Sequence, residues 1–269
     1  MTRGGRIAGL VVATVLLGTG LVACGEPSAP GSDPAQVDAV DAPEEGVCRL
    51  LTLPDIAQAS DATATVPCSG EHTAETYAVG ELPASLAEAA YDDPEIGAFA
   101  FETCTSALEK FLGGDVSVTM RSLLTWVWFR PSQKAWDSGA RWYRCDAVGG
   151  GEQSAALLTL PPTVRGLLEG RPEDAWMACV KGPSVSGSAT IPCARPHDWR
   201  AVTTIKLGEP AEAYPGDAQV ETTTRDFCSD SVGAWLNYPV DFDYGYTWFH
   251  EAEWDAGNRR SICWAKTRD

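Results

Sequence analysis

Two histidines each lie four residues after a cysteine. Of all the patterns in this chain, this spacing most resembles half of a metal site. His72 ends the stretch Val66-Pro67-Cys68-Ser69-Gly70-Glu71-His72, and His197 ends Ile191-Pro192-Cys193-Ala194-Arg195-Pro196-His197. Cysteine thiolate and imidazole are both zinc ligands. If the cysteines are oxidised, each imidazole instead hydrogen-bonds its own turn or contacts a partner. We expect the oxidised form, and therefore neither a metal nor a cofactor.

Residues for catalysis show no comparable organisation. The chain has no Gly-x-Ser-x-Gly motif for a serine nucleophile and no glycine-rich phosphate loop. Neighbouring acids such as Asp92 and Asp93, or Asp241 and Asp243, are the kind of pair that a glycosidase uses. Because the chain holds 37 acidic residues, such neighbours are ordinary on a solvated surface. We expect a protein that is not an enzyme.

Aromatic side chains are the other candidate binding groups. The chain has ten tryptophans, and indole faces provide large, flat contact surfaces for ligands such as carbohydrate. Trp136 and Trp254, however, begin matching Trp-Asp-x-Gly-x-Arg segments that end at Arg141 and Arg259. Matched positions near a cysteine favour core packing, with partner contact as the alternative. Three further tryptophans have no matched counterpart and leave a surface patch in one copy open: Trp126, Trp142 and Trp235.

These matches belong to an internal duplication. In each copy the last cysteine follows the matched Trp by nine residues, and the third follows the second by 36 residues in one copy and 35 in the other. The two sets are Cys48, Cys68, Cys104 and Cys145, and Cys179, Cys193, Cys228 and Cys263. Helical periodicity around each third cysteine predicts a buried face made of Ile96, Ala100, Cys104, Leu108 and Phe111 in one copy, and of Val220, Phe227, Cys228, Val232 and Trp235 in the other.

The duplication predicts an α+β fold of two tandem disulfide-stabilised repeats, residues 46–149 and 172–267, each a small antiparallel sheet with one main helix. Gly139 and Gly257 suit turns with a positive φ, and the strands beside each turn would form a hairpin ending in the last cysteine. The connecting segment, residues 150–171, contains an apolar stretch with a Pro-Pro break at 157–168, which we expect to pack between the repeats.

Eight cysteines outside the N-terminal region form an even set, as expected for disulfides in an exported chain. Four cysteines allow three pairings, and nearness in sequence is the only reason to favour one of them. That pairing joins Cys48 with Cys68, Cys104 with Cys145, Cys179 with Cys193, and Cys228 with Cys263.

The N-terminal region has the pattern of an export signal. Arg3 and Arg6 precede an uncharged apolar stretch that ends in Leu21-Val22-Ala23-Cys24-Gly25. This ending resembles the lipobox of bacterial lipoproteins, which implies cleavage after residue 23 and acylation of Cys24. A cleaved signal without lipid and an uncleaved anchor are the alternatives. Residues 24–45 carry six acids and no Lys or Arg, so we expect a flexible acidic linker there.

The charge of the mature chain limits its partners. The formal charge is −17, and loss of Arg3 and Arg6 with residues 1–23 takes it to −19. Such a chain repels nucleic acid, so we expect no nucleic-acid partner. It also repels anionic lipid, so the membrane partner would be reached through the acyl chains on Cys24. We expect a location on the extracytoplasmic face of the bacterial cell membrane.

The repeated pattern as a whole resembles the actinobacterial septum formation family. The resemblance rests on the apolar-Pro-Cys-x-x-x-His segments, the helix cysteine and the Trp-x-x-Gly-x-Arg segments, and it spans roughly residues 46–267. In that family an acid commonly follows the histidine; Glu75 occupies this place in the first copy, but Arg200 occupies it in the second.

The resemblance implies a protein of the cell envelope linked to septum assembly, with no established reaction. We expect a non-enzymatic binding or scaffold protein, whose partner would be a division protein, a wall-synthesis protein or a glycan. The candidate contact residues are His72, Glu75, His197, Trp136 and Trp254. A cell-wall polymer hydrolase and a small-ligand-binding lipoprotein are the alternatives.

Overall fold

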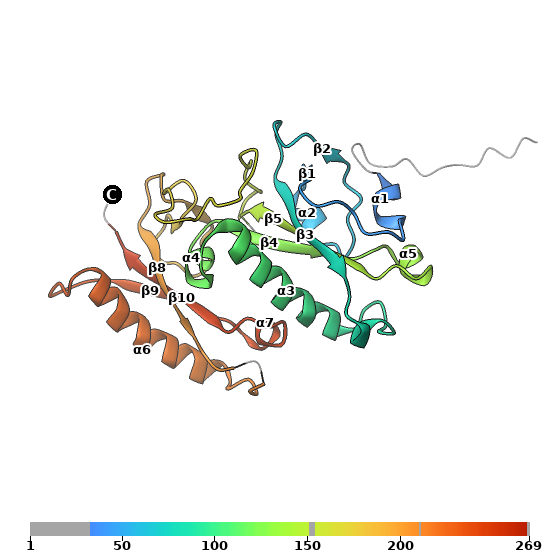
Figure 1. Ribbon diagram of the computed structural model, residues 1–269. Coiled ribbons are helices and arrows are strands. Elements are labelled where there is room, and N and C mark those ends of the chain that lie inside the picture. Colours follow the sequence, from blue (N-terminus) through green and yellow to red (C-terminus); the bar gives the residue numbers. More distant parts are fainter. Residues whose placement is uncertain (1–32, 151–153, 210, 268–269) are drawn as a thin grey trace, which may run out of the picture.

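The computed structural model describes residues 33–150, 154–209 and 211–267. It contains two five-stranded antiparallel sheets with identical strand order, β2-β1-β3-β5-β4 and β7-β6-β8-β10-β9 (Figure 1). One long helix packs on each sheet. The predicted α+β fold of two disulfide-stabilised repeats is therefore confirmed.

The first repeat places its long helix between the third and fourth strands. Helix α3 begins after Asp93, whose side chain accepts from the backbone N–H of Glu95, and it ends at Gly113, which has φ 75°. Its elements are β1 (Cys48–Arg49), α2 (Leu53–Ile56), β2 (Thr65–Val66), β3 (Ala74–Glu81), η1 (Ala84–Leu86), α3 (Pro94–Leu112), α4 (Val116–Met120), β4 (Leu124–Phe129), α5 (Gln133–Asp137) and β5 (Trp142–Gly149).

The second repeat follows the same order, but its described residues include no counterparts of α2, η1 and α4. Its elements are β6 (Ala178–Val180), β7 (Thr190–Pro192), β8 (Trp199–Lys206), α6 (Asp217–Trp235), β9 (Tyr244–Thr247), α7 (Glu251–Asp255) and β10 (Arg260–Lys266). Even an irregularity is shared. The pairing of β3 with β5 skips Tyr77, and that of β8 with β10 skips Val202, which is the matching residue.

The cysteines join the same two places in each repeat. The disulfides are Cys48–Cys68, Cys104–Cys145, Cys179–Cys193 and Cys228–Cys263, which is the pairing that nearness in sequence favours. One bond of each repeat ties the first strand to the end of the second, and the other ties the long helix to the last strand. The helix cysteines, Cys104 and Cys228, are fully buried as predicted.

The predicted helix face is right in the first repeat and partly wrong in the second. All five predicted residues of α3 are buried, whereas Phe227 and Trp235 of α6 are 36 % and 49 % exposed. Thr224 takes the inward position instead, and its hydroxyl donates to Ser261 Oγ over 2.9 Å. A buried threonine with a hydroxyl partner is invisible to an apolar pattern.

The predicted hairpins also need a correction. Gly139 and Gly257 have the expected positive φ, 101° and 109°, and β4 and β9 pair with β5 and β10. Short helices α5 and α7 interrupt the connections, however, so the two strands are not joined by a tight turn. In both repeats the glycine follows this helix.

The acidic linker predicted over residues 24–45 is not free in its described part. Helix α1 (Pro34–Asp38) lies on the first repeat, and the Val37 side chain is 7 % exposed. The Ser132 N–H donates to Val37 O over 2.9 Å, and the Trp142 indole donates to Ala39 O over 3.1 Å. The composition of this segment predicted a flexible linker. Its few apolar side chains and its carbonyl groups instead contact residues far along the chain.

Cys24 and the predicted signal, residues 1–23, lie outside the described residues. Within those residues, none of the helices has the length and apolar character needed to cross a membrane.

Acid should loosen the contact of α1 with the first repeat. Hydrogen bonds from Lys134 Nζ and then from Ser132 Oγ hold the pKa of Asp38 below its ordinary value. The stabilisation is therefore present above the unfolded-state pKa and is lost as pH falls through the folded-state value. The Trp142 indole N–H resonance should shift in that acidic range, because its acceptor is Ala39 O. In Asp38→Asn this pH dependence should disappear; an unchanged titration would contradict the assignment.

Candidate functional site

The two matched histidines turn into the fold. His72 is fully buried and His197 is 3 % exposed. Their Nδ1 atoms lie 2.9 Å from Gly70 O and 2.8 Å from Arg195 O, each two residues back along the turn. Both imidazole rings thus make the same hydrogen bond, each to a carbonyl oxygen of its own turn.

The metal alternative finds no support in the described residues. Among the described residues, Cys179, Cys193 and His197 form a group of three ligand-type side chains, with candidate atoms within 4.8 Å of one another. Cys179 and Cys193 are joined in a disulfide. A disulfide lacks the thiolates that zinc needs.

Glu75 is an anchor for the segment between the repeats. The side chain is 5 % exposed, and it accepts from Thr163 Oγ1 over 2.8 Å and from the Val164 N–H over 2.7 Å. Arg200, at the matching place in the second repeat, instead forms a surface ion pair with Asp174 at 2.5 Å. The Glu75 carboxylate is therefore engaged within the fold, and the second repeat has no acid at this place.

Trp136 and Trp254 are likewise interior, 5 % and 4 % exposed. In each repeat the motif arginine covers the indole: the guanidinium carbon of Arg141 lies 4.0 Å from the Trp136 ring centre, and that of Arg259 lies 3.7 Å from Trp254. The same arginines donate to the backbone oxygen of these tryptophans. Trp-x-x-Gly-x-Arg is therefore a cation–π clamp that closes the turn.

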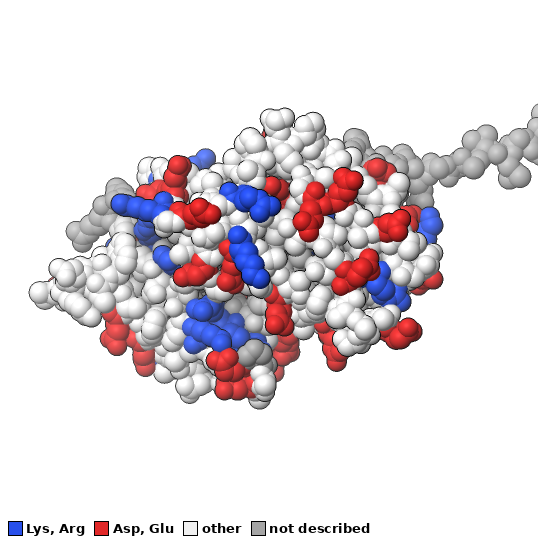
Figure 2. All heavy atoms as spheres, viewed as in Figure 1, with Lys and Arg blue, Asp and Glu red and all other residues white. Residues whose placement is uncertain are grey.

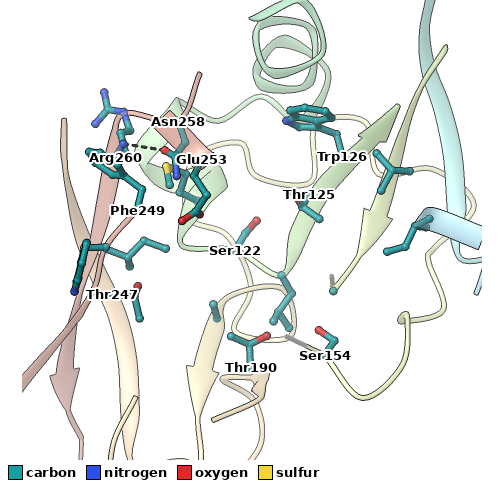
Figure 3. A pocket seen from close by; sticks show the side chains of 18 of the residues that line it. Ser122, Thr125, Trp126, Ser154, Thr190, Thr247, Phe249, Glu253, Asn258 and Arg260 are labelled. Carbon is teal, nitrogen blue, oxygen red and sulfur yellow. Dashed lines mark hydrogen bonds between the residues drawn. The ribbon is translucent and has the colours of Figure 1, made fainter. Parts of the chain in front are cut away.

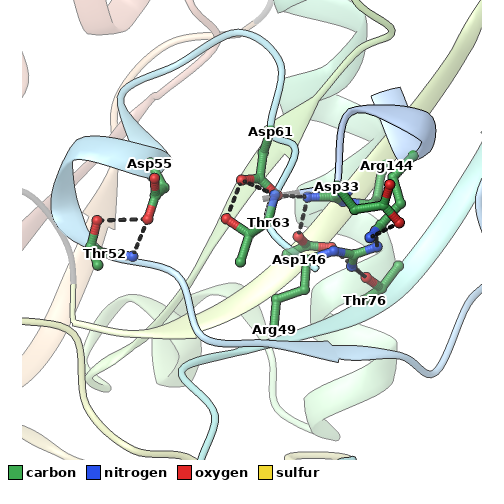
Figure 4. Close-up of polar contacts among 10 residues, drawn as sticks. Asp33, Arg49, Thr52, Asp55, Asp61, Thr63, Thr76, Arg144 and Asp146 are labelled. Atoms are coloured by element: carbon green, nitrogen blue, oxygen red, sulfur yellow. Dashed lines mark hydrogen bonds and ion pairs between the residues drawn. The ribbon is translucent and has the colours of Figure 1, made fainter. Parts of the chain in front are cut away.

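The first repeat also buries a cluster of charges that the sequence did not reveal (Figure 4). Arg144 Nη2 lies 2.8 Å from Asp61 and 2.9 Å from Asp146. Thr76 Oγ1 donates to Asp146 over 2.6 Å and accepts from Arg49 over 2.8 Å. All five side chains are buried. Burial lowers the pKa of Arg49, and the neighbouring Arg144 charge lowers it further.

The second repeat has apolar residues at the positions that form this charged cluster in the first repeat. The matched cysteines place Val180, Ala201, Ile262 and Trp264 at the positions of Arg49, Thr76, Arg144 and Asp146. Leu123, from the first repeat, packs into this apolar group. The difference in chemistry between the copies thus makes the joint between them.

Backbone hydrogen bonds fix the same joint. The Leu123 N–H donates to Trp176 O over 2.8 Å, and the Ala178 N–H donates to Arg121 O over 2.8 Å. A second contact lies nearby, where Phe101 of α3 sits 2.7 Å from the place a Cβ on Gly257 would occupy. Gly257 must therefore be glycine for close approach as well as for its φ. The joint contains a shared core and two backbone bonds.

A cleft of about 660 Å³ opens beside this joint. Figure 3 shows side chains of both repeats pointing into it, with Thr125 and Trp126 of β4 on one side and Thr247 and Phe249 on the other. Arg260, Asn258 and Glu253 lie at one end, and Thr190 and Ser122 contribute hydroxyls. Its volume is in the range typical of ligand sites.

The walls of the cleft offer groups that can stack on, pack against and hydrogen-bond a ligand. Its walls combine indoles, aliphatic side chains and hydroxyls with one carboxylate, Glu253, and one guanidinium, Arg260; no cysteine, histidine or lysine is among the described lining residues. Glu109 of α3 lies near Arg260, and burial raises its pKa while the Arg260 charge opposes that shift.

Sequence reasoning found one of these cleft residues. Trp126 has no counterpart in the second repeat and was one of three candidates for a copy-specific surface; it lies in the cleft, whereas Trp142 is buried and Trp235 lies at the end of α6. Alignment of the cysteines also shows that Ile262 and Trp264 replace the charged residues Arg144 and Asp146 in the second repeat. That signal identifies the apolar joint.

Comparison with known proteins places both repeats in one family. No curated protein and no solved structure matches the chain. The family model described as septum formation matches residues 45–263, which include nearly all of both sheets and both long helices. The match covers most of the chain. The chain belongs to the septum formation family.

Proposed function

We propose that this protein is a lipid-anchored, extracytoplasmic binding protein of the bacterial envelope that supports septum formation without catalysis. Membership of the septum formation family links it to cell division and the envelope. The observation that carries the proposal of binding is the cleft, which both repeats line and which their shared core holds open.

The joint favours a fixed site over two independent ones. Leu123 is 4 % exposed within the core of the other repeat, and residues 121–123 exchange two backbone hydrogen bonds with residues 176–178. A preformed cleft spends little free energy on ordering when a partner binds. The partner is a division protein, a wall-synthesis protein or a glycan that presents a group small enough for the cleft.

The anchor would hold this cleft close to the membrane. Cys24 is the proposed acylated residue, and the described structure begins at Asp33 on the surface of the first repeat. Nine residues span at most about 30 Å when fully extended. Docking of residues 33–45 thus gives a shorter reach than a free linker over residues 24–45 would give.

Site-specific crosslinking in cells tests the proposal. A photoreactive residue at Thr190, which points into the cleft, should capture a division or wall-synthesis component or wall glycan. Thr65 occupies the matching place in the first repeat, is exposed and does not line the cleft, so it is the control. Products should form at Thr190 and not at Thr65.

The Cys24→Ala variant in the same experiment tests the tether. Loss of membrane attachment should remove the Thr190 products, because the anchor sets the distance to the partner. Equal products from both positions would argue against the cleft as the binding site. Release of wall fragments by the purified protein would instead support the hydrolase alternative.

A further inference from the structure

The long helices of the two repeats end in the same way but have different surroundings. With Cys104 and Cys228 aligned, Leu112 of α3 matches Leu236, and Gly113, with φ 75°, matches Asn237, with φ 63°. In both repeats, the residue that follows the helix has the left-handed backbone conformation. The last carbonyl groups of a helix have no partner within the helix and need donors from outside.

In the first repeat, the segment between the repeats covers the helix end. Leu160, Val164 and Leu168 are each at most 5 % exposed and pack against the end of α3. This corrects the expectation that residues 157–168 pack between the repeats: most of their apolar contacts are with the first repeat. Leu158 alone among its leucines packs against the shared core of the second.

The segment also supplies the missing donors. The Gly166 N–H donates to Phe111 O over 2.8 Å, and the Leu168 N–H donates to Leu112 O over 2.9 Å. The Arg165 guanidinium lies over the Phe111 ring at 4.4 Å. An apolar peptide segment with two free N–H groups is thus what satisfies this helix end.

In the second repeat, the described residues include no such cover. Trp235, which matches Phe111, is 49 % exposed, and the following Tyr238 and Val240 are 75 % and 99 % exposed. No backbone donor among the described residues reaches Trp235 O or Leu236 O. Beside them lies a hollow of about 510 Å³ lined by Leu236, Pro239, Asp241, Phe242, Asp243 and Lys266.

We propose that the end of α6 is a second binding site, which takes an apolar peptide segment of a partner protein as the end of α3 takes residues 160–168. The peptide places aliphatic side chains against Trp235 and Leu236 and donates two backbone N–H groups to their carbonyl oxygens. This site is separate from the cleft, so it stands or falls independently of the proposed function.

A membrane surface fits this tip less well. Exposed Trp, Tyr and Val are side chains that enter lipid interfaces, and Figure 2 shows the tip, at the left, as a largely uncharged protrusion. Asp241 and Asp243 line the hollow beside it, however, and would be repelled by anionic head groups. Helix α1, which follows the proposed anchor, lies at the opposite end of the molecule (Figure 1).

Nuclear magnetic resonance with the full chain and a synthetic peptide tests the site. The probe is a peptide with the sequence of residues 157–170, which contains the groups that cover α3. Added to isotope-labelled protein, it should shift the resonances of residues 232–243. The control peptide carries N-methyl groups at the nitrogens of Gly166 and Leu168, which keeps the side chains but removes both donors. Its affinity should be lower by at least about tenfold.

Variants distinguish binding at this site from non-specific binding to exposed apolar side chains. Trp235→Ser with Tyr238→Ser should abolish the shifts, whereas Leu50→Ser, at a leucine that is 47 % exposed in the first repeat, should not change them. The proposal is overturned if the peptide shifts nothing at millimolar concentration, or if the N-methylated peptide binds equally well. It is also overturned if the tip binds vesicles of anionic lipid but no peptide, or if it only joins two copies of this chain.

Discussion

Replacing Arg144 with methionine should lower the free energy of unfolding by about 3–5 kcal/mol, the largest loss we expect from one substitution. Arg144 is 1 % exposed and pairs with Asp61 and Asp146, which are equally buried. Removal of the guanidinium leaves two carboxylates in the interior without their cation, and an unpaired buried charge costs this much. Urea unfolding followed by tryptophan fluorescence measures the loss.

A surface ion pair of the second repeat provides the control. Arg200→Met breaks an ion pair with Asp174 in which the arginine side chain is 25 % and the aspartate 53 % exposed, so it should cost no more than about 1 kcal/mol. Asp61→Leu and Asp146→Leu, added to Arg144→Met, should recover part of the loss, because the second repeat has Ile262 and Trp264 at the matching positions of Arg144 and Asp146. Equal small effects of Arg144→Met and Arg200→Met would contradict the buried cluster.

Removing the disulfide between helix and last strand should cost about 4 kcal/mol in the first repeat. Cys104 and Cys145 are 41 residues apart and both fully buried, whereas Cys179 and Cys193 are 14 apart. In the chain-entropy model the longer loop gives the larger stabilisation, about 4 against about 3 kcal/mol. Cys104→Ala with Cys145→Ala should therefore destabilise the protein more than Cys179→Ala with Cys193→Ala.

Chemical unfolding of the two double variants, with the other three disulfides intact, checks this order. Both pairs are buried, so alanine leaves a cavity in either core, and the expected order follows from loop length. A larger loss from the Cys179–Cys193 pair would show that loop length does not govern the contribution of these bonds.

The features that repeat in the chain were the ones that sequence could predict. Two sets of four cysteines with matched spacing led to the two sheets, to the inward helix cysteines and to the turn glycines Gly139 and Gly257. Each of these features depends on a local pattern that occurs in both repeats: a helix face, a turn with a positive φ, or a Trp and an Arg five residues apart. Agreement between copies separates such requirements from chance.

What sequence could not predict are contacts between distant residues that occur once. Residues 33–45 read as a linker because their composition is polar, yet Val37 and Ala39 find partners on α5 and β5. The burial of Arg144 cannot be predicted from local pattern, because its partner Asp61 lies 83 positions earlier. The cleft depends on how two repeats meet, and no periodicity within either repeat describes that joint.

The matched candidate residues hold the fold together in the structure. His72, Glu75, His197, Trp136 and Trp254 recur or stand at matched places because they close turns and hold segments. Trp126 and Trp235 occur in one copy only, and both reach the surfaces we propose for binding. After a duplication, shared residues maintain the fold while unshared ones are free to take on recognition.

Filling the cleft tests the central claim most directly. Thr190→Trp places an indole in the cleft, whereas Thr65→Trp places the same group on the exposed, matching strand of the first repeat. Both variants should fold with unchanged unfolding midpoints. In native host cells that lack the wild-type protein, Thr65→Trp should restore normal septa, and Thr190→Trp should leave septa misplaced or absent. Full restoration by Thr190→Trp would contradict the account, because a filled cleft could then support septum formation.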